Sequence, residues 1–162
     1  MQLRYFNQPH FENGSLKLIS QVLKEQGISR PLICTDPGLV AIGMTDKIRN
    51  LLSNELSPTF YTETPANPTE QAVNDALELY KQNNCDGVVG FGGGSSMDLA
   101  KAVALMANHE GNVVDYSVNE GGTGKIQETV PTVAIPTTSG TGSEFSLLSL
   151  IHISEPTRRY RI

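Results

Sequence analysis

The sequence predicts an α/β domain in which helices flank a parallel β-sheet. Short runs with high β propensity alternate with segments of helical periodicity up to about residue 107, and this alternation is typical of βαβ units. The chain has 162 residues, of which 38% are apolar, and this size corresponds to about one domain with its own core. Residues 108–128 lack such a pattern, so we expect them to form a surface loop within the same domain.

The expected strands are apolar or β-branched runs at residues 3–6, 31–35, 59–62, 87–91 and 132–135. Two apolar helical faces are expected between the first three strands. The first face ends before Gly27, a residue that suits a left-handed helix end, and the second follows a break at Gly43. The members are Leu16, Ile19, Val22 and Leu23 in the first face, and Met44, Ile48, Leu51 and Leu52 in the second.

Two further helices have clearer starting signals. For the first, we expect Asn67 as the N-cap, Pro68 at the first helical position and Glu70 as the acid of a capping box. We expect the second to begin at Ser95, with Asp98 three residues later.

Charge and hydropathy exclude several classes of partner. The net charge is −5, which argues against a protein that binds nucleic acid. No apolar run approaches the roughly 18 residues of a membrane span, and residues 1–10 lack the apolar stretch of a signal peptide. We therefore expect a cytoplasmic protein without a membrane partner. Cys34 and Cys85 have no metal-ligand spacing and are expected to be reduced structural thiols.

The segment 87–101, GVVGFGGGSSMDLAK, predicts a phosphate-binding turn. An apolar strand leads into glycines at positions 90, 92, 93 and 94 and then into a helix. Glycines let backbone N–H groups approach a ligand, and a helix N-terminus favours an anion such as pyrophosphate. Neither a GxGxxG pattern nor a P-loop is present, because Ser95 replaces the third glycine of the former and Ile126 replaces the Ser or Thr of the latter. The alternative is that the glycines form only a tight turn.

The segment 136–144, PTTSGTGSE, follows the last expected strand. Hydroxyl groups at the carboxyl ends of parallel strands can bind sugar, phosphate or carboxamide groups. The alternative is an ordinary loop rich in serine, threonine and glycine. The hydroxyls are those of Thr137, Thr138, Ser139, Thr141 and Ser143.

Asp36 ends the second expected strand and precedes Pro37. A carboxylate at this place can accept a hydrogen bond from the 2′-hydroxyl of a ribose. It can also cap a helix that begins at Pro37, and one carboxylate can do both. The histidines His10, His109 and His152 have no metal spacing, and no GxSxG motif is present, so no other catalytic group is expected.

Four segments resemble the iron-containing (group III) alcohol dehydrogenase family. They are RPLICTDPGL at 30–39, PANPTEQAV at 65–73, GFGGGSSMDLAKAVA at 90–104 and PTTSGTGSE at 136–144. The resemblance covers residues 5–145 and implies a dinucleotide-binding domain with a Rossmann-like parallel sheet flanked by helices. It implies hydride transfer between NAD, or NADP, and a primary alcohol or aldehyde, helped by Fe²⁺ or another divalent metal. It also implies a homodimer or a higher oligomer.

The resemblance assigns roles to individual residues. Gly92, Gly93, Gly94 and Ser95 would surround the pyrophosphate, and Asp98 would lie at the cofactor site. Asp36 would meet the adenosine ribose, and Asn67 would lie near the cofactor. The loop residues that would contact the cofactor are Thr137, Thr138, Thr141 and Ser143.

The resemblance ends near residue 147. In the family, an all-helical domain follows and supplies an aspartate and three histidines to the metal, whereas residues 145–162 read FSLLSLIHISEPTRRYRI. We expect a dinucleotide-binding domain at 1–146 and an unmatched tail at 147–162, which we interpret as the end of a truncated reading frame. This chain would then hold no metal ligand and no catalytic residue, and would not oxidise alcohols by itself. Two alternatives remain: a non-catalytic nucleotide-binding module, and an enzyme similar to dehydroquinate synthase.

Overall fold

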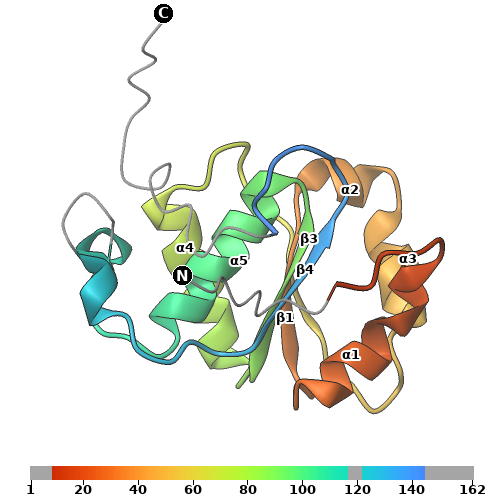
Figure 1. The fold of residues 1–162 in the computed structure, drawn as a ribbon, viewed down its shortest axis with the longest axis horizontal. Helices are drawn as coiled ribbons and strands as arrows, with labels where there is room; N and C mark the ends of the chain where they lie inside the picture. Colours follow the sequence, from red (N-terminus) through yellow and green to blue (C-terminus); the bar gives the residue numbers. More distant parts are fainter. Residues whose placement is uncertain (1–8, 117–121, 145–162) are drawn as a thin grey trace, which may run out of the picture.

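The computed structural model describes residues 9–116 and 122–144 of the chain. Four strands form one parallel sheet in the order β2-β1-β3-β4 (Figure 1). This confirms four of the expected strands, and the one expected at 3–6 lies outside the described residues. The strands are β1 (Pro31–Cys34), β2 (Thr59–Tyr61), β3 (Gly87–Gly92) and β4 (Thr132–Pro136).

Helices cover both faces of the sheet, as Figure 1 shows. One face carries α4 (Glu70–Gln82) and α5 (Gly94–Met106). The other carries α1 (Ile19–Glu25), which continues the 3₁₀ helix η1 (Ser15–Leu18), and α3 (Met44–Leu51). The short α2 (Pro37–Ala41) follows β1, and Gly43, with φ 74°, separates it from α3 as expected. Among the described residues, no helix has the length and apolar character to span a bilayer.

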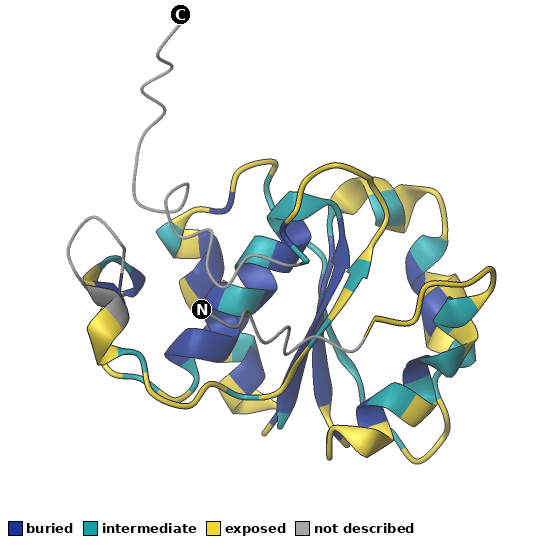
Figure 2. Ribbon diagram, in the orientation of Figure 1, coloured by how far each residue is buried: buried dark blue, intermediate teal, exposed yellow. Residues whose placement is uncertain are grey.

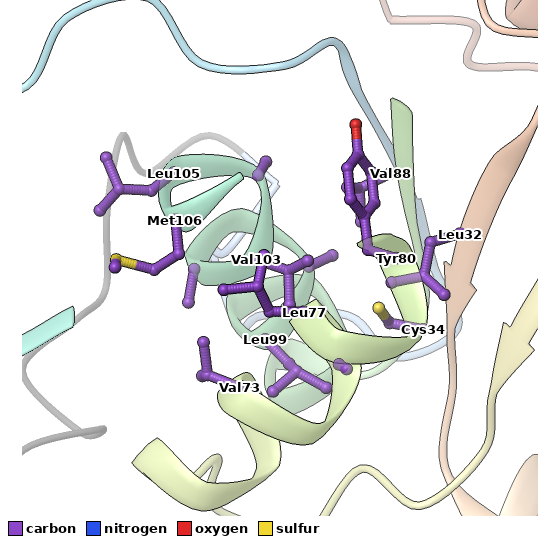
Figure 3. Close-up of a cluster of buried hydrophobic side chains, with 14 of the residues drawn as sticks. Leu32, Cys34, Val73, Leu77, Tyr80, Val88, Leu99, Val103, Leu105 and Met106 are labelled. Atoms are coloured by element: carbon purple, nitrogen blue, oxygen red, sulfur yellow. The ribbon is translucent and has the colours of Figure 1, made fainter. Parts of the chain in front are cut away.

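Each helical layer packs on the sheet through its own buried cluster. Leu32 of β1 and Val88 of β3 point toward the α4–α5 layer, whereas the next residues, Ile33 and Val89, point toward the α1–α3 layer. This alternation follows from the two-residue period of a strand. Both central strands are buried on both faces, as Figure 2 shows. The larger cluster, drawn in Figure 3, includes Val73, Leu77 and Tyr80 of α4 and Leu99, Val103 and Met106 of α5.

The start of α4 differs from the prediction. Its N-cap is Thr69, whose Oγ1 accepts a hydrogen bond from the Ala72 N–H at 3.2 Å. The Thr69 backbone is extended, with φ −104° and ψ 160°, as an N-cap requires. The prediction that Asn67 caps the helix and that Pro68 opens it was wrong, because the threonine hydroxyl two residues later makes the capping bond.

The start of α5 also differs. The helix begins at Gly94 with Gly93 as its N-cap, so the prediction that it begins at Ser95 was wrong by one residue. The Ser95 hydroxyl does not cap the helix, because it donates a hydrogen bond to the Ala66 carbonyl. No side chain caps this N-terminus.

The expected loop at 108–128 contributes to the core. It contains the 3₁₀ helices η2 (Val113–Tyr116) and η3 (Gly122–Lys125), and both Val113 and Tyr116 are buried against the α4–α5 layer. His109 joins this segment to α5. Its Nδ1 lies 2.7 Å from the Leu105 carbonyl oxygen, and its Nε2 accepts the Gln127 N–H at 2.8 Å. Both ring nitrogens are therefore engaged in structural contacts.

Cys34 and Cys85 are buried free thiols. Burial is the largest influence on both, and it raises the pKa of each thiol because the thiolate loses its hydration. This environment agrees with the predicted structural role.

Candidate functional site

The strand order brings the ends of β1 and β3 together. The chain leaves β1 toward β2 on one side and returns to β3 on the other side of β1. Ligands of open α/β sheets bind at such a reversal, beyond the carboxyl ends of the strands. Asp36 follows β1 there, and Gly93 and Gly94 follow β3. The carboxyl ends lie at the top of Figure 1, together with α2 and the loop after β4.

The glycine turn is closely packed on both sides. A Cβ atom on Gly92 would lie 2.4 Å from Ser96 Oγ and 3.1 Å from Asp36 Oδ2, and the φ of 153° is one that side-chain-bearing residues rarely adopt. A Cβ on Gly93 would lie 3.3 Å from Thr138 Oγ1, and one on Gly94 would lie 3.1 Å from Ser143 Oγ. A side chain would therefore meet Ser96 and Asp36 at position 92, Thr138 at position 93 and Ser143 at position 94.

The N-terminus of α5 is suited to an anion. Gly93 caps it with extended backbone and supplies no side-chain oxygen, so the first N–H groups of a 13-residue helix keep their donor capacity. The Ser96 hydroxyl in this first turn is 1% exposed and has no hydrogen-bond partner among the described residues. Unpaired donors and a positive dipole end at one place favour a phosphate group.

Asp36 uses its two carboxylate oxygens differently. Oδ1 accepts a hydrogen bond from the Leu39 N–H at 3.0 Å and caps α2. Oδ2 faces Gly92 on the neighbouring strand. The capping interpretation is thus confirmed, and the cap orients the second oxygen toward the glycine turn.

The 136–144 segment folds back over α5. Its first amide, Thr137 N–H, donates to the Gly92 carbonyl at 2.9 Å and extends the pairing of β3 with β4. Thr138 and Thr141 are exposed, whereas Ser143 is 7% exposed and packs beside Gly94. Three of the predicted hydroxyl residues therefore lie against the glycine turn or the first turn of α5.

Asp98 and Lys101 lie further along the same helix. Asp98 Oδ1 is 3.0 Å from Lys101 Nζ, and the two side chains are 11% and 17% exposed. Lys101 Nζ also donates to the Ser143 carbonyl at 2.8 Å. Sequence reasoning placed Asp98 at the site but missed Lys101, although the three-residue spacing of the two charges on a predicted helix was a signal for this pair.

Asn67 and Ser95 connect a further segment to the site. The hydrogen bond from Ser95 Oγ to the Ala66 carbonyl holds residue 66 against the first turn of α5, and Asn67 next to it is exposed. Sequence reasoning did not predict this link, because the carbonyl lies 29 residues away along the chain.

Two cavities lie away from this site, on the other side of the sheet. A cavity of about 310 Å³ is lined by Lys17, Lys47 and Leu51, and one of about 180 Å³ by Lys24, Ser53 and Leu56, on the α1–α3 side. No group of three or more His, Cys, Asp or Glu side chains that could hold a metal occurs in residues 9–116 and 122–144.

Comparisons with known proteins agree with this geometry. The family description "Iron-containing alcohol dehydrogenase" matches residues 7–162. The chain is 40% identical over 152 residues to 4-hydroxybutyrate dehydrogenase of Cupriavidus necator, covering 93% of the chain and 40% of that enzyme. It is 39% identical over 139 residues to choline dehydrogenase of Bacillus subtilis, covering 85% of the chain and 35% of that enzyme.

Solved structures give the same result. Sulfoacetaldehyde reductase from Bifidobacterium kashiwanohense, in complex with NAD⁺, has a TM-score of 0.75 and 31% identity, over 90% of this chain and 39% of that chain. NADH-dependent butanol dehydrogenase A from Thermotoga maritima has a TM-score of 0.71 and 27% identity, over 85% of this chain and 36% of that chain. The chain spans about 40% of the length of such relatives.

Proposed function

The chain belongs to the iron-containing alcohol dehydrogenase family, and from that premise we propose that the described residues form the dinucleotide-binding part of an NAD-dependent alcohol dehydrogenase. The observation that carries the proposal is the glycine turn at the N-terminus of α5, which no side chain caps. The pyrophosphate of NAD would accept hydrogen bonds from the first N–H groups of this helix. Gly93 lies between the end of β3 and the first residue of α5, where the pyrophosphate is proposed to bind.

The residues of the turn fit a dinucleotide. A Cβ atom at Gly92, Gly93 or Gly94 would lie against neighbouring side chains, so glycine at these positions lets polar side chains pack close to the peptide groups of the turn. Ser96 adds a buried hydroxyl that lacks a partner among the described residues. An ordinary tight turn would need neither an open helix end nor an orphaned hydroxyl behind it.

Asp36 is the proposed contact for the adenosine ribose. Its Oδ2 faces the glycine turn, and a carboxylate there accepts hydrogen bonds from a 2′-hydroxyl but repels a 2′-phosphate. We therefore expect NAD to bind more tightly than NADP.

The hydroxyl groups after β4 would complete the site. Thr137 and Thr138 are exposed after β4, and their hydroxyl groups can donate hydrogen bonds to the dinucleotide. Thr141 and Ser143 would line the same site beside Gly94. Asn67 would border the site from the 65–68 segment, which Ser95 of α5 holds in place through the Ala66 carbonyl. Asp98 would support the site from the second turn of α5 through its pair with Lys101.

The proposed reaction of the whole enzyme is the interconversion of a primary alcohol and its aldehyde. A bound nicotinamide ring would supply the acceptor for the hydride of the alcohol carbon, and the hydroxyl proton of the alcohol would be released to water. The described residues bind the dinucleotide and fix its orientation. Residues 9–116 and 122–144 include no set of side chains that fits the divalent metal of the family. Oligomeric assembly remains a prediction from the resemblance.

Calorimetric titration of NAD into the 162-residue chain tests the proposal. We expect saturable binding to the unsubstituted chain and at least a tenfold weaker affinity in Gly93→Val, because the new side chain would displace Thr138 and narrow the approach to the first N–H groups of α5. Gly93 has φ −76° and ψ −170°, which valine adopts readily, and the atom nearest to its Cβ would be Oγ1 of the exposed Thr138 at 3.3 Å, so the fold should persist. Gly124→Val is the matched control, since a Cβ on Gly124 meets nothing within 4 Å. Equal affinities in all three chains would refute the proposed site.

A further inference from the structure

Three residues on one face of α5 lie against the loop that follows β4. Gly94, Asp98 and Lys101 are spaced by four and then three positions, which places them in one row along a helix. A Cβ on Gly94 would lie 3.1 Å from Ser143 Oγ and 3.3 Å from Thr141 Cβ. About two turns later, Lys101 Nζ donates to the Ser143 carbonyl at 2.8 Å. The loop therefore contacts both ends of this row.

The charge of Lys101 is balanced within the helix. Its Nζ lies 3.0 Å from Asp98 Oδ1, and both side chains are more than four-fifths buried, at 17% and 11% exposure. Burying an ammonium group is costly unless a carboxylate and hydrogen-bond acceptors surround it. Because Asp98 supplies the opposite charge, Lys101 can donate a hydrogen bond from the interior of the protein to the loop.

We propose that Lys101 is a positioning residue for dinucleotide binding, which holds the 137–143 loop against the glycine turn through the Ser143 carbonyl. The inference rests on the proposed function of the same site. Thr137 fixes the start of the loop by its bond to the Gly92 carbonyl at 2.9 Å, and Lys101 fixes the end. Between these anchors, Thr138 and Thr141 are exposed beside the turn. A loop fixed at both ends loses little conformational entropy when a ligand binds.

Asp98 acts through Lys101 in this arrangement. A direct attraction between Lys101 and a phosphate is disfavoured by distance, because Lys101 lies seven residues, or about 10 Å of helix rise, beyond Gly94. It is also disfavoured by charge, since the Asp98 carboxylate cancels the ammonium at 3.0 Å. The contribution of Lys101 to affinity is therefore the placement of the loop.

The test combines NAD affinity with amide hydrogen exchange of residues 137–143. Lys101→Met keeps the length of the side chain but removes the donor to Ser143. We expect roughly tenfold weaker NAD binding, the effect of losing one charge-assisted hydrogen bond, and faster exchange throughout the loop. Lys17→Met, at an exposed lysine on the α1–α3 side, is the control and should change neither quantity.

A double variant separates placement of the loop from damage to the fold. Lys101→Met alone leaves the Asp98 carboxylate buried without its ion-pair partner, whereas Asp98→Asn combined with Lys101→Met removes both charges at similar volume. We expect the double variant to be more stable than Lys101→Met in urea but to bind NAD equally weakly, because both variants lose the hydrogen bond from Lys101 to the Ser143 carbonyl.

Three results would overturn the inference. Unchanged NAD affinity in Lys101→Met despite faster loop exchange would mean that the loop position does not matter for binding. Weaker affinity with unchanged loop exchange would mean that Lys101 contacts the dinucleotide directly. Recovery of affinity in the double variant would assign the loss to the unpaired Asp98. Failure of the unsubstituted chain to bind NAD is a different result, and it would refute the proposed function.

Discussion

Asp36 Oδ2 lies 3.1 Å from the position that a Cβ atom on Gly92 would occupy. The two residues belong to the ends of neighbouring parallel strands, and the Cα atoms of Cys34 and Gly90 pair two residues earlier in each. The carboxylate and the glycine turn are therefore parts of one site, and a side chain at position 92 would press against the Asp36 carboxylate.

Gly92→Ala should destabilise the fold by about 1–3 kcal/mol, because alanine is strained at a φ of 153° and its methyl group would meet Ser96 Oγ at 2.4 Å. Urea denaturation followed by circular dichroism measures the change. Gly124→Ala is the control and should stay within about 0.5 kcal/mol of the unsubstituted chain. A loss in Gly92→Ala no larger than in this control would contradict the steric account of the turn.

Asp36→Asn should narrow the preference for NAD over NADP by roughly tenfold, because an amide no longer repels a 2′-phosphate. Asparagine is also a good N-cap, so α2 should persist through the Leu39 N–H bond. The measurement is the ratio of the two dissociation constants. A ratio that stays the same would leave Asp36 with its capping role alone.

Thr69→Ala should lower the free energy of unfolding by about 0.5–2 kcal/mol, because the Ala72 N–H loses its capping acceptor. Asn67→Ala is the matched comparison two residues earlier and should leave stability unchanged, since Asn67 is exposed and does not cap α4. If Asn67 borders the dinucleotide, the same substitution should weaken NAD binding. A stability loss in Asn67→Ala equal to that in Thr69→Ala would contradict the observed cap.

Stability should fall at alkaline pH because of the two thiols. Burial raises the pKa of Cys34 and of Cys85 above the ordinary value of 9.0, so the unfolded chain releases these protons at lower pH than the folded chain does. Their contribution to stability is complete below pH 9 and is lost as the pH rises above it, by up to about 1.4 kcal/mol per pH unit for each thiol.

Urea denaturation between pH 7 and 10 measures this dependence. Cys34→Ala removes one of the two thiols and should reduce the slope above pH 9. In the native chain both thiols should also react slowly with a thiol reagent at pH 8, and quickly in urea. A flat stability profile up to pH 10 would contradict the role assigned to burial.

The positions of β1 and β3 could be predicted from the sequence because their apolar runs reflect burial on both faces. β2 and β4 are only partly buried, and their β-branched and aromatic residues indicated them. The order β2-β1-β3-β4 could not be predicted, since the placement of β3 beside β1 depends on packing between segments far apart in the chain. The N-cap of α4, Thr69, was missed by two residues, and the first residue of α5, Gly94, was missed by one. Several nearby residues could have served as caps, and the backbone conformation of the turn decides among them.

The residues of the candidate site could be predicted from the sequence, but not all of the contacts between them. The sequence pointed to Asp36, the glycines and the hydroxyl segment because each follows a predicted strand, and the structure brings them to one edge of the sheet. The spacing of Asp98 and Lys101 indicated their ion pair, but the contact of Lys101 with Ser143 was missed because the two residues lie 42 positions apart. Contacts of this kind leave no local pattern in a sequence.

The place of β1 at the centre of the sheet has a consequence for biosynthesis. Both strands that pair with β1 come later in the chain, and Pro31 pairs with Gly87, which is 87 − 31 = 56 residues further on. At a translation rate of about 5–20 residues per second, a ribosome needs roughly 3 to 11 seconds to add those residues. During that interval the apolar residues 31–34 lack the β3 neighbour and present an unpaired edge. A nascent chain at this stage is a natural client for a chaperone that binds extended apolar segments.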